Sequence, residues 1–102
     1  MKIHNKLVRD KIPEIIEESG RICTTHILSA EDYIVALETK LNEEVAEYQE
    51  EKNLEEMADV LEVLRAICIA RGYTIEQLEL VRKKKADERG GFANKIFLEY
   101  VE

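Results

Sequence analysis

Two long segments, residues 30–51 and 54–71, constrain the fold most, because neither contains glycine or proline and both carry apolar residues at helical spacing. Ser29 precedes the first segment as an N-cap, and Asp32 three residues later makes a weak capping box. Asn53 is a good N-cap for the second segment, which Gly72 ends. Since only two residues separate the segments, they are predicted to form an antiparallel helical hairpin.

Shorter elements flank this hairpin. Residues 11–19 are predicted to form a short helix, with Pro13 in its first turn. A capping box at residues 74–77 opens a further helix, which runs to about residue 89. Residues 21–28 are rich in β-branched side chains and predict a short strand or extended loop, with which residues 96–101 could pair.

The fold class is therefore mainly α, with a helical hairpin, short flanking helices and a small two-stranded β element. At 102 residues the chain is the size of a single domain. One hairpin cannot bury two apolar faces, and the short helices add little cover. We therefore expect a second copy of the chain to complete a four-helix-bundle-type core.

Composition excludes several classes of protein. The net charge of −7 argues against binding to a nucleic acid polymer, where lysine and arginine must neutralise phosphates. No apolar run approaches the roughly 20 residues of a membrane span, so we expect no membrane partner. Residues 1–6 contain no apolar h-region, so we expect no signal peptide and a cytoplasmic location.

The most informative acidic residues lie on or beside the apolar stripes of the two long helices. At about 100° per residue, Glu44 falls inside the stripe of residues 30–51, and Glu47 lies on its edge. The apolar face of residues 54–71, expected to turn inward, consists of Met57, Val60, Leu61, Leu64 and Ile67, with Val63 at its edge. On this segment, Glu56 falls within the apolar sector and Asp59 at its edge. Each helix thus carries a pair of acids three residues apart.

The hairpin is expected to bring these pairs to the same height. The midpoint between Glu47 and Glu56, like that between Glu44 and Asp59, falls between residues 51 and 52, beside the predicted turn. Because both helices rise about 1.5 Å per residue from that turn, all the carboxylates should converge.

Like charges about 4 Å apart repel by roughly 4 kcal/mol at an effective dielectric of 20. Such a group therefore needs raised pKa values or a bound cation. Oxygen ligands without a thiol favour Mg²⁺, with Mn²⁺ as a substitute, over zinc. The alternative is structural: Glu56 as a capping-box acid, Glu47 as a solvated flank, and a nearby lysine compensating the glutamate on the stripe.

Residues 43–47 read EEVAE and residues 55–61 read EEMADVL. This pattern resembles the EExxE…ExxD signature of the MazG-like all-α nucleoside triphosphate pyrophosphohydrolase superfamily, which includes phosphoribosyl-ATP pyrophosphohydrolase and the dimeric dUTPases. Residues 5–13 (NKLVRDKIP) and 89–92 (RGGF) resemble the ends of short, stand-alone house-cleaning proteins of that superfamily. The resemblance spans nearly the whole chain.

The resemblance implies a homodimer or homotetramer that cleaves a nucleoside triphosphate between its α and β phosphates. By matching positions, Glu44, Glu47, Glu56 and Asp59 would bind magnesium. One of these acids or Glu43 would activate the attacking water, which makes Glu43, Glu44 and Glu47 the catalytic candidates.

A polyphosphate also needs cations. Lys6, Arg9 and Lys11 form one basic cluster near the N-terminus. Lys85 and Arg89 lie one helical turn apart beside two glycines, a place suited to closing over a substrate. Ordinary surface charge and a solvated helix C-terminus are the structural alternatives for these clusters.

Several alternatives stay open at this point. Within the enzyme class the second candidate is a phosphoribosyl-ATP pyrophosphohydrolase, since no substrate-selecting segment is recognisable. Outside that class, the chain could be a non-catalytic helical dimer that binds a nucleotide and metal, or its acids could form a charged seam for a partner helix. The aromatic contact to a base could come from Tyr33, Tyr48 or Phe92.

Overall fold

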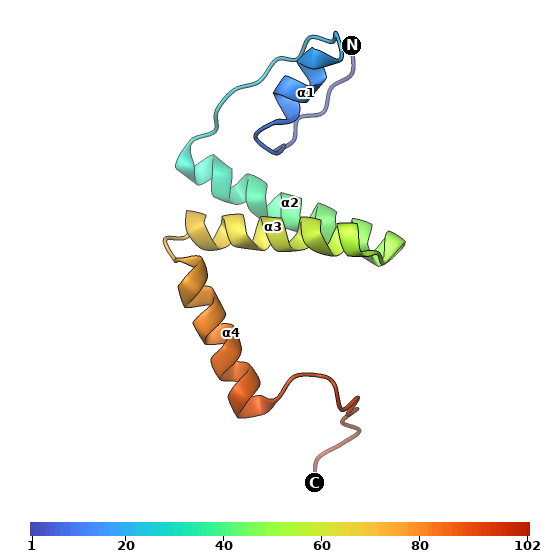
Figure 1. Ribbon diagram of the computed structural model, residues 1–102, viewed down its shortest axis with the longest axis vertical. Helices are drawn as coiled ribbons and strands as arrows, with labels where there is room; N and C mark the ends of the chain where they lie inside the picture. The colour runs from blue at the N-terminus through green and yellow to red at the C-terminus, as the bar shows by residue number, and fades with distance from the viewer.

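The computed structural model describes all 102 residues and contains four helices and no strand. In chain order these are α1 (Ile12–Glu18), α2 (Ala30–Glu51), α3 (Leu54–Ala70) and α4 (Ile75–Arg89) (Figure 1). The mainly α fold class is therefore confirmed. None of the helices combines the length and the apolar content that crossing a membrane requires.

The expected helical hairpin is formed by α2 and α3, which lie side by side along their length (Figure 1). The Ser29 hydroxyl accepts a hydrogen bond from the Asp32 amide, at 3.2 Å, and fixes the start of α2. Lys52 takes a left-handed conformation with φ 52°, and the Asn53 side chain accepts from the Glu56 amide, at 2.9 Å. The two-residue turn is thus set by one strained residue and one cap.

The flanking helices also follow their sequence signals. Pro13 stands in the first turn of α1, and Gly20 takes a positive φ of 88° just after that helix. At the start of α4 the Thr74 hydroxyl accepts from the Gln77 amide, and the Gln77 side chain accepts from the Thr74 amide. Both halves of the predicted capping box are therefore present.

The chain alone builds only a small core. Of its 102 residues four are buried, and the apolar ones are Leu37, Val63 and Cys68. The Cα radius of gyration is 18.1 Å, whereas a compact chain of this length would have about 13 Å. The reason is visible in Figure 1, where α4 and the C-terminal tail extend away from the hairpin.

An apolar stripe on α3 is left open to solvent. Met57, Leu61 and Leu64 are 46%, 57% and 42% exposed, although the sequence pattern placed them on the inner face of the hairpin. Val63, expected at the edge of that face, is buried instead. Val60 and Ile67 of the same face are half-buried, so the face is rotated partly outward and the stripe of Met57, Leu61 and Leu64 is its exposed part. A single chain therefore forms no four-helix bundle.

The predicted β element is wrong for this chain. Residues 21–28 form an irregular connection before α2, and residues 96–101 form no regular element. The two segments lie at opposite ends of the molecule, beyond α2 on one side and beyond α4 on the other (Figure 1). The two segments do not pair, and residues 21–28 take the alternative of an extended loop. An isolated two-stranded ribbon would be marginal in any case.

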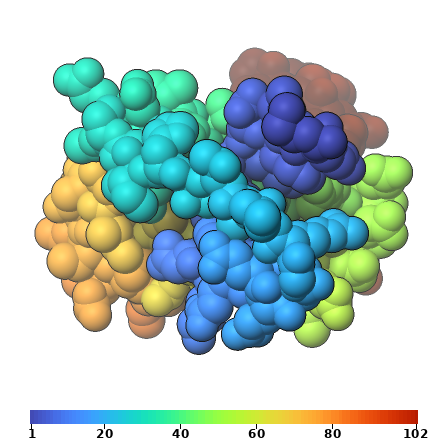
Figure 2. Space-filling view, turned by 90° about the horizontal axis from the view of Figure 1, so that it is seen from above, coloured from blue at the N-terminus to red at the C-terminus, as the bar shows by residue number.

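The N-terminal part covers one side of the hairpin. In the view of Figure 2, residues 1–28, drawn in blue to cyan, lie over the green and yellow hairpin. Residues 7–11, here called the N-terminal strap, line an open pocket of about 410 Å³ together with residues of α2 and α3. This arrangement places basic side chains next to the acidic ones.

Candidate functional site

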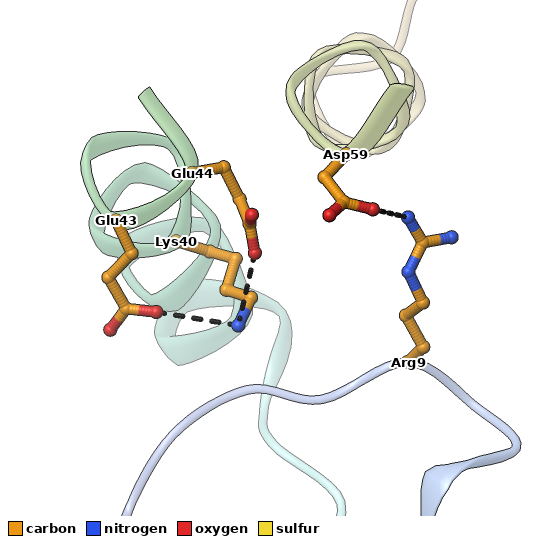
Figure 3. Close-up of polar contacts among 5 residues, drawn as sticks. All are labelled: Arg9, Lys40, Glu43, Glu44 and Asp59. Carbon is orange, nitrogen blue, oxygen red and sulfur yellow. Dashed lines mark hydrogen bonds and ion pairs between the residues drawn. The ribbon is translucent and has the colours of Figure 1, made fainter. Parts of the chain in front are cut away.

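Three of the four expected acids converge between the paired helices. Glu44 projects from α2, and Glu56 and Asp59 project from α3; one carboxylate oxygen of each lies within 4.8 Å of the others. Glu44 is 8% exposed, while the other two are partly buried. Figure 3 shows the carboxylates of Glu44 and Asp59 directed into the space between the two helices. This group is called the acid cluster below.

Glu47 lies beside the acid cluster and is exposed. Its negative charge is close enough to raise the pKa of both Glu44 and Glu56. The expectation that residues three apart on α2 would face the same space is therefore met in part. Glu44 is inside the cluster and Glu47 is on its rim.

The pKa values of the two central glutamates are raised. For Glu44 the largest cause is burial, followed by the negative charge of Glu47; the positive charge of Lys40 partly opposes the shift. For Glu56 the largest cause is again burial, followed by the charges of Glu47 and Asp59. Both carboxyls therefore lose their proton less readily than an isolated glutamate does.

Two buried oxygen atoms in the acid cluster have no hydrogen-bond partner, Oε2 of Glu44 and Oε2 of Glu56. Leaving a buried acceptor unsatisfied costs about 1–3 kcal/mol, and more when the group is charged. A hard divalent cation among oxygen ligands would satisfy both atoms and offset the repulsion between the acids. The residues present thus fit a divalent metal site.

Lys40 is a residue that the sequence analysis did not single out. Its Nζ lies 3.5 Å from Oε1 of Glu44 and 3.4 Å from Oε2 of Glu43, and its side chain is only 18% exposed (Figure 3). The signal was the three- and four-residue spacing to two glutamates. Glu43, a catalytic candidate, is thereby paired with Lys40 and lies outside the acid cluster.

The N-terminal basic cluster is divided by the structure. Arg9 donates a hydrogen bond from its guanidinium Nη2 to Oδ1 of Asp59, at 2.7 Å (Figure 3). Lys11 lines the same pocket as Arg9, together with Lys40, whereas Lys6 is exposed and outside that lining. The pocket therefore brings Glu44 and Asp59 of the acid cluster next to several cations.

The second basic cluster is not brought to the acids within one chain. Lys85 and Arg89 lie on α4, which contacts α3 at the connecting turn and then runs away from the hairpin (Figure 1). Arg89 instead borders a separate open hollow of about 410 Å³ formed with residues 90–96.

The three aromatic candidates separate clearly. Tyr33 lines the pocket beside the acid cluster. Tyr48 lies beneath the ammonium group of Lys52, 5.8 Å from the ring centre to Nζ, at the hairpin turn. Phe92 is 98% exposed in the tail. Of the three, only Tyr33 lines this pocket.

Comparison with known proteins adds a partial relative. The chain is 55% identical over 42 residues to an uncharacterised protein of Mycolicibacterium smegmatis. The match covers 41% of this chain and 43% of that protein, so the chain spans less than half the length of this curated relative. No family model matches the chain, and no solved structure matches it.

Proposed function

We propose that this protein is a magnesium-dependent pyrophosphohydrolase that converts a nucleoside triphosphate to the monophosphate and pyrophosphate. The observation that carries the proposal is the buried Glu44, whose unpartnered Oε2 belongs to a group of carboxylates within 4.8 Å of one another. A buried carboxylate oxygen without a partner is costly, so its presence on a residue that lines a pocket favours a functional role. The resemblance of residues 43–47 and 55–61 to the EExxE…ExxD signature points to the reaction.

Glu44, Glu56 and Asp59 would hold the metal, and Glu47 on the rim would be the fourth expected ligand. Mg²⁺ suits such oxygen ligands, and Mn²⁺ can replace it. When bound, the ion would neutralise phosphate oxygens and orient an in-line attack by water.

The chain's own residues would supply the proton acceptor and the anion contacts. A glutamate with a raised pKa is a better base than an ordinary one, which favours Glu44 among the three catalytic candidates. Arg9 and Lys11, which line the pocket, would bind phosphate oxygens, and Tyr33 would contact the base. A homodimer or homotetramer would cover the exposed stripe of Met57, Leu61 and Leu64.

The test is a panel of canonical, deoxy and modified nucleoside triphosphates and phosphoribosyl-ATP, assayed for pyrophosphate with Mg²⁺ or Mn²⁺. We expect Glu44→Gln and Glu56→Gln each to lower kcat/KM by about 10²–10⁴-fold. Glu55→Gln is the matched control, because this neighbour of Glu56 is exposed and lies outside the acid cluster. Its activity should stay close to that of the unsubstituted chain.

The outcomes separate the candidate functions. Preference for phosphoribosyl-ATP would assign the chain to that reaction instead. Calorimetric binding of a triphosphate without any product would identify a non-catalytic nucleotide-binding protein. Melting that is insensitive to both metal and chelator would leave only a structural role for the acids.

A further inference from the structure

The contact between Arg9 and Asp59 joins distant parts of the chain. Only two ion pairs link residues more than four positions apart, and this one spans 50 residues. The other, between Arg71 and Glu38, joins the C-terminal end of α3 to α2. The Arg9 pair instead attaches the N-terminal strap to one member of the acid cluster (Figure 3).

Little else holds the N-terminal part of the chain to the hairpin. Helix α1 makes no close backbone contact with the other helices, and residues 1–8 make no hydrogen bond to α2 or α3. Along the strap, Leu7 is half-buried and Val8 is exposed. Arg9 is therefore the main polar attachment of the strap.

The guanidinium of Arg9 and a divalent cation would compete for the same partner. Both are positively charged, and both would take lone pairs of the Asp59 carboxylate, from which Arg9 Nη2 is 2.7 Å distant. Arg9 and Asp59 are 57% and 37% exposed in their side chains, so the pair is a surface contact that can break at modest cost.

We propose that Arg9 is an internal counter-ion that neutralises Asp59 while the acid cluster holds no metal, and that a divalent cation displaces it and releases the strap. This rests on the proposed metal site. The strap then lies over the pocket in the metal-free protein and opens when the metal binds. Arg9 is left free to meet an anionic ligand in the same pocket.

The first test measures Mn²⁺ affinity of the full chain by electron paramagnetic resonance. Arg9→Gln removes the competitor, so we expect Mn²⁺ to bind about two- to fivefold more tightly, the range that a half-exposed pair allows. Lys11→Gln removes a positive charge from the lining of the same pocket but breaks no ion pair, and should change the affinity less.

Equal effects of the two substitutions would overturn the proposal, because general electrostatics would then explain both. Weaker binding by Arg9→Gln would overturn it as well. If none of the proteins binds Mn²⁺, the metal site itself is refuted and the inference falls with it. Binding by all three with no difference would refute only the counter-ion role of Arg9.

The second test follows the strap directly. Backbone ¹⁵N relaxation at Leu7, Val8 and Asp10 should show lower order parameters when Mg²⁺ is added to the unsubstituted chain. Arg9→Gln should show the lower values without metal and no further change with it. Order parameters of the strap that Mg²⁺ leaves unchanged would exclude its release.

Discussion

Glu44 is a buried acid that is expected to destabilise the fold in which it lies. The hairpin buries its side chain and leaves one oxygen atom without a partner, although Lys40 lies 3.5 Å from the other. The compensation by a nearby lysine, which the sequence suggested as a purely structural alternative, is thus present but incomplete. An acid in this state is expected to limit the stability of the metal-free protein.

The direction of the pKa shift gives the first prediction. In the folded state the pKa of Glu44 is raised above 4.5, the ordinary value expected for the unfolded chain. At pH values between these two pKa values, the folded state binds more protons than the unfolded state. In chelator, stability from this group is present at low pH and is lost as pH rises through that interval. Glu44→Gln should therefore be more stable than the unsubstituted chain at neutral pH.

Urea unfolding as a function of pH checks this expectation. The stability difference between the two proteins should shrink as pH falls toward 4.5. Glu55→Gln, at an exposed position, should show no such change of the stability difference with pH. A difference that stays constant across the pH range would mean that Glu44 does not titrate as described.

Metal addition should have the opposite effect on the same residue. A ligand that binds only the folded state at 100 times its Kd stabilises it by about 2.7 kcal/mol. Saturating Mg²⁺ should thus raise the Tm of the unsubstituted chain, and chelator should reverse the change. Calorimetry should detect little or no rise for the double variant Glu44→Gln, Glu56→Gln.

At the scale of the elements, the turn between α2 and α3 sets the geometry of the acid cluster. Asn53 accepts a hydrogen bond from the Glu56 amide, so the N-cap of α3 also fixes the backbone at a member of the acid cluster. Asn53→Ala should lower the free energy of unfolding by about 1 kcal/mol, the usual value of an N-cap. Asn53→Asp should retain most of that stability.

Chemical denaturation measures the cap directly, and Asn42→Ala is a suitable control, because Asn42 is exposed in the middle of α2. Alanine is the better helix former there, so this substitution should be neutral or slightly stabilising. Similar losses of stability at both positions would indicate that the side chain of Asn53 contributes nothing specific.

The elements and the acid cluster could be predicted because they depend on short-range rules. The caps at Ser29, Asn53 and Thr74 act within three residues of the chain. Glu44 and Asp59 are separated from the predicted turn by equal numbers of residues, which predicted that they lie at the same level along the two helices. The rotation of α3 was harder to predict, since the pattern alone could not show that Val63 would be buried and Leu61 exposed.

Contacts between distant segments could not be predicted. The pair of Arg9 with Asp59 spans 50 residues, and nothing in the local sequence of either residue specifies the other. The direction of α4 could not be predicted either, because the sequence of the short turn after α3 does not specify it. The sequence therefore could not show that Lys85 and Arg89 would lie away from the acid cluster.

At the scale of the whole molecule, the exposed apolar surface predicts association. Met57, Leu61 and Leu64 form a stripe on α3, and few residues of the single chain are buried. Light scattering after size-exclusion chromatography should give the mass of a dimer or tetramer. Leu61→Glu should shift this toward the mass of one chain, because a charge would then enter an apolar interface.

Thr39→Glu adds the same charge to an exposed position on α2 and should leave the mass unchanged. A chain that is monomeric at all accessible concentrations would contradict the proposed bundle. It would also require another explanation for the outward rotation of the stripe on α3.

The position of the hairpin turn has a further consequence for related sequences. Because the acids of α2 and α3 are spaced equally from residues 51 and 52, one inserted residue in either arm would displace its acids by about 1.5 Å and rotate them by about 100°. Longer hairpins can keep the cluster only if both arms grow together, by about seven residues each, which is close to two full turns. Insertions at the tip, between the arms, face no such restriction.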